Sequence, residues 1–182
     1  MKTKHLFVAL AAFITTVSAF AQGTITFNNR TSAGDAPIFA YDGVTGAGSI
    51  PGVIAELDLV TGTGPLFTYT PVGTTPFRGT SGALAQFIQG VDLTVPGVAA
   101  GAPANFVVRA YYGSSWDAAI DRAQSGVVAV PALGGAPPSG APPIPTPDLS
   151  GLQSFGFRFI PEPSTVSLGV VGAAVLLLRR RK

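Results

Sequence analysis

Cysteine is absent from this chain of 182 residues, and histidine occurs once, at His5. A chain without cysteine forms no disulfide, so its stability has to come from its core. Because no second histidine exists, the body builds neither a Ser-His-Asp nor a Cys-His centre, and the soft ligands of zinc are missing. A phosphate-binding loop is also missing, since Gly62-Thr63-Gly64 lacks the Gly-Lys-Ser/Thr ending. These absences predict a protein that is not an enzyme, with no catalytic residue, metal or cofactor.

Charge is scarce as well: 11% of the residues are charged, and the only lysines are Lys2, Lys4 and Lys182. Residues 22–160 hold five arginines against eight carboxylates, which gives a net charge of −3. A nucleic-acid-binding surface needs clustered cations that neutralise phosphates, so this composition excludes nucleic acid as a partner. The many glycines (23) and prolines (16), together with valine, threonine and phenylalanine, predict short strands joined by turns.

The N-terminal segment has the pattern of a secretory signal. Two lysines precede an apolar stretch over residues 6–20, and Ala19-Phe20-Ala21 is a cleavage site of the A-x-A type. We therefore expect residues 1–21 to form a signal helix that the export machinery and signal peptidase handle, which leaves Gln22 as the first mature residue. An uncleaved N-terminal anchor or a buried helix is the alternative interpretation.

The C-terminal segment, residues 161–182, combines a proline punctuation, an apolar run and a basic end. Residues 164–178 are uncharged, and a helix of that length rises about 22 Å, less than the roughly 30 Å of a hydrocarbon core. The run therefore predicts a short transmembrane helix whose basic tail, residues 179–182, reaches back to the cytoplasmic interface. This helix is either cut off after export or kept as a single-pass anchor, and both interpretations remain open at this point.

Taken together, Pro161-Glu162-Pro163-Ser164, the apolar run and the basic end resemble the PEP-CTERM sorting signal of Gram-negative bacteria. The resemblance implies recognition by exosortase, a membrane-embedded cysteine protease, followed by removal of the tail and delivery to the cell surface or exterior. Such bacteria often make exopolysaccharide, which the resemblance implies as a further partner. Residues 22–30 (QGTITFNNR) resemble the start of the glycine-rich bodies that carry this tail. The sorting residues that the resemblance implies are Pro161, Glu162, Pro163, Ser164, Arg179, Arg180 and Arg181.

Alternating apolar residues predict an all-β body over residues 22–160, an antiparallel β-sandwich or jelly-roll-like domain. One short helix is expected over residues 115–124, where Ser114 and Asp117 form an S-x-x-D start. The proline-rich stretch 131–150 predicts an extended loop. Residues 152–160 form either the last strand or a stalk, and we expect return to the sheet because an exposed phenylalanine face is costly. The expected strands cover residues 24–28, 37–41, 53–60, 66–70, 84–88, 91–95, 105–112, 127–130 and 152–160.

Two groups of side chains are candidates for a site. Glu56 and Asp58 share one face of a strand, where they form a solvated surface, a calcium site or an acid/base pair, of which we favour the first. Tyr111, Tyr112 and Trp116 cluster at the end of a strand, where they either fill the core or stack on sugar rings. Asp117 and Asp121 offer a weaker calcium alternative.

Three functions follow, in decreasing order of support. The first is a non-enzymatic exported protein of the cell surface or extracellular matrix. The second is a carbohydrate-binding module that uses Tyr111, Tyr112 and Trp116, with or without calcium. The third is a glycosidase, which needs two carboxyl groups facing one cleft about 5 to 9.5 Å apart.

Overall fold

The computed structural model describes residues 22–64, 66–137 and 140–158. This part of the chain is all-β, as predicted, and the segments predicted as signal (1–21, with Ala19 and Ala21) and sorting tail (161–182) lie outside it. No helix among the described residues is long and apolar enough to cross a membrane. The strands are β1 (Gln22–Phe27), β2 (Arg30–Thr31), β3 (Gly34–Asp35), β4 (Ile38–Phe39), β5 (Val53–Thr61), β6 (Thr68–Pro76), β7 (Val91–Ala99), β8 (Ala104–Tyr112), β9 (Arg122–Gln124), β10 (Val128–Val130) and β11 (Phe155–Gly156), and two 3₁₀ turns are η2 (Ala47–Ser49) and η3 (Gly82–Gln86).

The main sheet is antiparallel, in the order β10-β8-β5-β6, with β9 also paired to β8. Alternate side chains of a strand point to opposite faces, so β5 and β8 each send one apolar set to the same side. That set is buried, as the alternation predicted. It consists of Val53, Ala55, Leu57 and Leu59 from β5 and Phe106, Val108 and Ala110 from β8.

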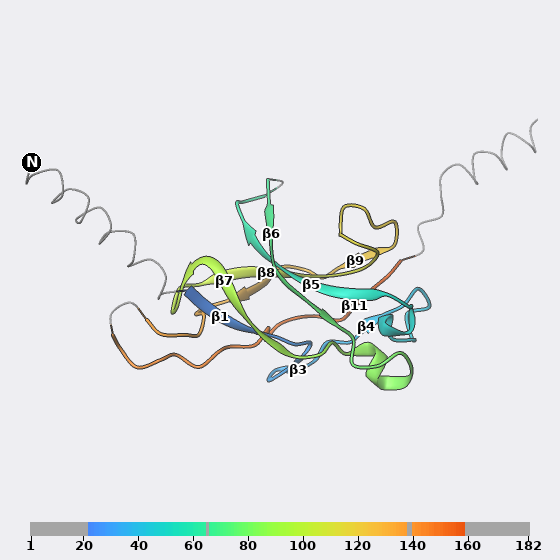
Figure 1. Cartoon of the computed structure of the whole chain (residues 1–182), viewed down its shortest axis with the longest axis horizontal. Coiled ribbons are helices and arrows are strands. Elements are labelled where there is room, and N and C mark those ends of the chain that lie inside the picture. The colour runs from blue at the N-terminus through green and yellow to red at the C-terminus, as the bar shows by residue number, and fades with distance from the viewer. Residues whose placement is uncertain (1–21, 65, 138–139, 159–182) are drawn as a thin grey trace, which may run out of the picture.

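β1 and β7 form a separate antiparallel pair that lies on the core side of the main sheet (Figure 1). Ile25, Phe27 and Val95 of this pair join the same core as the apolar face of β5 and β8. β6 meets β7 closely, because a Cβ on Gly73 would stand 2.8 Å from a methyl carbon of Leu93. A larger residue at this position would require the Leu93 side chain to shift.

The C-terminal part of the described body returns to the fold rather than leaving it as a stalk, but as a two-residue strand outside the main sheet and not as the long last strand expected over residues 152–160. β11 pairs in parallel with β4, and the backbone N–H of Phe157 donates to the carbonyl of Phe39 at 3.0 Å. Phe157 is buried and Phe155 packs against the core from its edge, whereas Phe159 lies outside the described residues. Residues 155–157 are therefore an anchored end of the domain.

The proline-rich segment is extended, as expected, and it also pairs with β1. Thr24 and Gly134 exchange two backbone hydrogen bonds of 2.9 Å, and the N–H of Thr26 donates to the carbonyl of Pro147 at 2.8 Å. Leu133 and Leu149 are fully buried. β1 thus lies between β7 on one edge and this segment on the other, which holds the N-terminal strand of the body from both sides.

The helix predicted over residues 115–124 is wrong. Only one turn forms, in which the N–H of Ala119 donates to the carbonyl of Ser115 and the N–H of Ala118 donates to Ser115 Oγ. Beyond it the chain extends as β9 along β8, because a short isolated helix is marginal whereas the edge of β8 offers a full set of backbone partners. The strand expected over residues 84–88 is also wrong, since η3 occupies most of it.

A serine joins β9 to β10 on that same edge of β8. The N–H of Ser125 donates to the carbonyl of Val108, and Ser125 Oγ accepts from the N–H of Val108, both at 2.9 Å. The side chain therefore replaces a backbone acceptor where the ladder is interrupted. As a result, β9 and β10 act as one edge strand with a bulge between them.

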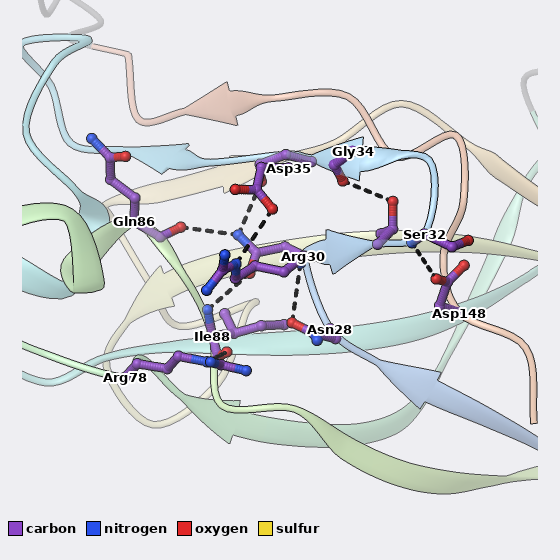
Figure 2. Close-up of polar contacts among 12 residues, drawn as sticks. Asn28, Arg30, Ser32, Gly34, Asp35, Arg78, Gln86, Ile88 and Asp148 are labelled. Atoms are coloured by element: carbon purple, nitrogen blue, oxygen red, sulfur yellow. Dashed lines mark hydrogen bonds and ion pairs between the residues drawn. The ribbon is translucent and has the colours of Figure 1, made fainter.

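Asn29, at the end of β1, ties the N-terminal segment to η3. Its side chain is fully buried, and Nδ2 donates to the carbonyls of Ala36 and Gln86 while Oδ1 accepts from the N–H of Ile88, each at 2.9 Å. Figure 2 labels Gln86 and Ile88, and dashed lines mark the hydrogen bonds of their backbone groups. Because two of the three bonds are buried and the third is partly buried, the site demands an amide with both donor and acceptor.

Candidate functional site

The second face of the main sheet carries a compact polar cluster. Glu56 and Asp58 come from β5, and Arg109 and Tyr111 come from β8, where Arg109 lies directly opposite Glu56. The exposed fractions of Glu56 and Asp58 are 6% and 0%. The prediction of a solvated carboxylate face is therefore wrong, because this face of the sheet is covered as well. We call Glu56, Asp58, Arg109 and Tyr111 the acid cluster.

Two direct contacts hold the acid cluster together. The Tyr111 hydroxyl donates to Glu56 Oε2 at 2.6 Å, and Arg109 Nη1 lies 3.1 Å from Asp58 Oδ2. Arg109 Nε also donates to Gln124 Oε1 of β9 at 3.2 Å. Each carboxyl group thus has one partner from β8, so the polar contacts run between neighbouring strands of the sheet.

Aromatic rings and guanidinium groups cover the acid cluster. The guanidinium carbon of Arg109 lies 4.2 Å from the ring centre of Tyr69 and 4.6 Å from that of Trp116, so it sits between the two rings. Arg122 lies 5.3 Å from the Trp116 ring, and Tyr111 meets Trp116 edge-on at 6.2 Å. We call Tyr69, Arg109, Trp116 and Arg122 the cation–aromatic stack, whose attraction arises between ring quadrupoles and charge.

The stack reaches the acid cluster from two sides. Tyr69 comes from β6 in the β5–β6 hairpin, and Trp116 comes from the connection between β8 and β9; both segments rise on the same side of the main sheet (Figure 1). Their rings close over Arg109 and shield the carboxyl groups from water. The fold of residues 113–121 is therefore what turns a nominal surface of the sheet into a second small core.

Burial changes the electrostatics of Asp58. Desolvation raises its pKa from 3.8 to about 7; the charge of Arg109 opposes the rise, and the charge and hydrogen bond of Glu56 add to it. Neither oxygen of Asp58 has a hydrogen-bond donor among the described residues, and only the ion pair with Arg109 reaches one of them. A proton on Asp58 supplies the missing bond, because the carboxyl group then donates to Glu56. The acid cluster is thus built to retain one proton.

The pKa values of two tyrosines, Tyr111 and Tyr41, are also raised. Burial, with the Glu56 hydrogen bond and charge behind it, raises the pKa of Tyr111. At the outer end of the connection, burial first and then a hydrogen bond and charge from Asp121 raise the pKa of Tyr41 to about 12. Both phenols therefore remain neutral donors at neutral pH, and Asp121 is engaged with Tyr41.

The structure brings together part of the predicted aromatic group. Tyr111 and Trp116 meet in the covered site, and Tyr111 is 3% exposed with its hydroxyl on Glu56, which supports the packed interpretation. Tyr112 points to the other face of the strand, is 52% exposed, and lies against Gly52. A continuous platform of the three rings is therefore not formed.

The acid cluster can hold a proton and bind strands together, but its carboxyl groups are covered. Neither of the two acids is exposed enough for a sugar or an ion to reach it in this conformation. Across residues 22–64, 66–137 and 140–158, no group of three or more carboxylates or histidines is arranged to hold a metal ion. Pro161, Glu162, Pro163, Ser164, Arg179, Arg180 and Arg181, with Ala19 and Ala21, lie outside the described residues.

Sequence reasoning missed Arg109, Tyr69 and Arg122 as members of the site. One signal was available: Arg109 interrupts an apolar strand and lies opposite β5, the only strand with two acids among the described residues. A charge in a strand with apolar neighbours on both faces needs a buried partner, and Glu56 and Asp58 are the ones within register. Tyr69 and Arg122 gave no comparable signal, since their role depends on how two connections fold over the sheet.

No family model, curated protein or solved structure matches this chain.

Proposed function

We propose that the chain is an exported protein of the cell surface or extracellular matrix, with transport signals at both ends and a non-catalytic body between them. The supporting observation is that the body is anchored close to both predicted signals. Thr24 of β1, three residues after the predicted cleavage site, exchanges two backbone hydrogen bonds with Gly134. The buried Phe157 lies four residues before Pro161. Described residues next to each predicted signal therefore belong to the fold of the body.

For the body we propose an antiparallel sandwich or jelly-roll-like arrangement, flanked in the precursor by a signal helix and a transmembrane helix. The support is the single core shared by the β1–β7 pair and the main sheet, to which Phe27, Val95 and Phe106 contribute. Two antiparallel layers around one core are the defining feature of sandwiches. The parallel pair of β4 and β11 departs from that pattern.

The proposed route has two processing steps. In the first step, the export machinery takes up the chain and signal peptidase removes residues 1–21. In the second step, an exosortase-type membrane protease recognises Pro161-Glu162-Pro163-Ser164 and the arginines behind the apolar run. Before the second step the protein is held in the inner membrane by residues 164–178. Afterwards it reaches the cell surface or the exterior, where exopolysaccharide is its proposed partner.

A localisation experiment in a Gram-negative host with an exosortase tests this route. The variant with Pro161, Glu162 and Pro163 replaced by alanine is expected to stay in the inner membrane with its tail attached. The matched control Arg158→Gln, just outside the signal, is expected to be exported and shortened like the natural chain. Equal export of both variants with the tail still present would contradict the proposal.

Carbohydrate binding is a second candidate, favoured only by the half-exposed ring of Tyr112 and the partial exposure of Trp116. In a glycan array, Tyr112→Ala and Trp116→Ala are the informative variants, with and without Ca²⁺. Binding that either variant abolishes would establish this function. Absence of binding by the natural chain in both conditions would eliminate it.

A further inference from the structure

Gln22 is the first residue of β1, and its side chain is exposed while the next residue is fixed. Gly23 is buried against Leu133, where a Cβ would stand 2.5 Å from a methyl carbon. Thr24 is held by two backbone hydrogen bonds to Gly134, and the pairing with β7 is irregular between Gln22 and Gly23. The backbone is therefore anchored from residue 23 onward, and Gln22 pairs with Ala99 at the very end of β1, beyond the irregular step.

We propose that Gln22 is a modification site, at which the mature N-terminus cyclises to pyroglutamate. This inference rests on the proposed function, because it needs the cleavage that makes Gln22 the first residue. Cleavage places a free α-amine on the same residue as an exposed carboxamide.

The reaction needs no additional reagent. The neutral α-amine attacks the Cδ carbonyl carbon of its own side chain, a new N–C bond closes the lactam, and the bond from Cδ to the amide nitrogen breaks. The departing nitrogen takes the proton released by the attacking amine and leaves as ammonia. An α-amine has a pKa of about 7.7 to 8.0, so roughly a tenth to a sixth of it is neutral and nucleophilic at pH 7.

The fold tolerates the product. The lactam ring uses only the nitrogen, Cα and side chain of Gln22, so its backbone carbonyl keeps its place beside Gly135. Anchoring by Gly23 and Thr24 is unchanged. Cyclisation also removes the positive charge that a free terminus would add at the edge of β1.

Cyclisation has a further consequence, because the chain has no lysine between Lys4 and Lys182. Lys2, Lys4 and Lys182 all lie in the segments proposed to be removed, and the residues between them contain none. Once both ends are cut, the α-amine of Gln22 is the only primary amine left in the polypeptide. Its cyclisation therefore yields an exported protein without any primary amine, closed to aminopeptidases and to amine-directed cross-linking.

Peptide mass spectrometry of the exported protein, before and after an amine-reactive reagent, tests the inference. The N-terminal peptide is expected to begin at residue 22, to be lighter by one ammonia, and to resist labelling. Gln22→Asn is the matched control: it keeps an exposed carboxamide, but closure would give a strained β-lactam, so its peptide is expected to keep the full mass and to accept one label.

Two results would overturn the inference, and they differ in what else they overturn. A natural chain that begins at Gln22 with a free, labelled amine refutes cyclisation and leaves the proposed export intact. An exported chain that retains residues before Gln22 refutes both. Because the N-terminal peptide is analysed separately, a retained Lys182 does not confuse either result.

Discussion

Replacing Asp58 by asparagine removes the proton that the acid cluster is built to retain. In the natural chain the Asp58 pKa is about 7 in the folded protein and 3.8 as an ordinary carboxyl group. Between these two values the folded protein keeps a proton that the unfolded chain has released. The free energy of unfolding therefore falls as the pH rises from about 4 to about 7, and it changes little from this source above pH 7.

The size of the effect follows from the same two values. At 1.36 kcal/mol per pH unit, the interval corresponds to a loss of about 4 kcal/mol across the window. Asp58→Asn has no such dependence, because its amide is neutral throughout and donates to Glu56 as the protonated acid does. The difference in unfolding free energy between natural chain and variant is thus expected to shift by about 4 kcal/mol in favour of the variant between pH 4 and pH 7.5.

Urea unfolding of the exported protein, followed by the fluorescence of Trp116, measures this difference at several pH values. Trp116 is the only tryptophan of the chain and belongs to the cover of the acid cluster, so the probe reports on the site itself. Asp35→Asn is the matched control, since Asp35 is half-exposed in a surface pair with Arg30 that contributes little. The reasoning is refuted if the natural chain is equally stable at pH 5 and pH 7.5, or if Asp58→Asn keeps the natural slope.

Three further substitutions follow from named contacts. Asn29→Ala leaves two carbonyls and one buried N–H without their Asn29 partner, and it is expected to lower the unfolding free energy by about 3 kcal/mol or more. The control Asn28→Ala, at a half-buried residue, is expected to cost about 1 kcal/mol or less. Calorimetry that finds the two variants equally stable would contradict this. Tyr111→Phe removes the donor to Glu56 and is expected to cost about 1 to 3 kcal/mol in urea unfolding, and a neutral effect would show that the bond does not contribute. Trp116→Ala opens the stack and is expected to speed hydrogen exchange of the amides in β9 and the β8–β9 connection, while unchanged protection there would argue against its role as a cover.

The apolar alternation of the sequence predicted the all-β class and the core side of the strands. Val53, Ala55, Leu57 and Leu59 alternate with other residues, and period two is a property of the strand itself. The same pattern failed on the opposite face, where Glu56 and Asp58 were expected in solvent. Local alternation shows which side chains share a face, but it carries no information on whether a distant connection folds over that face.

The helix expected over residues 115–124 shows a second limit. One turn does form, but its cap is Ser115, which accepts from the N–H groups of Ala118 and Ala119, and not Ser114 of the predicted S-x-x-D start. What overrides it is the edge of β8, which pairs Arg109 with Gln124 and Tyr111 with Arg122. A short helix loses to a ladder that also places Arg122 on the Trp116 ring, and neither partner is visible from the local sequence.

The described parts of the proline-rich segment 131–150 were predicted correctly as extended, and only the pairing partner of the segment was missed. Proline fixes φ and lacks the N–H that a helix interior needs, and its enrichment is visible in the sequence. That Gly134 and Pro147 accept hydrogen bonds from β1 depends on the pairing of segments more than a hundred residues apart. The order of the chain does not determine which edge of β1 remains free for them.

The intact mass of the protein collected from the cell exterior tests the central claim most directly. Processing at both ends predicts one species that runs from residue 22, lighter by one ammonia, to a C-terminus near Pro163. An exported species whose mass requires Lys182 or any residue of the first 21 would contradict the account.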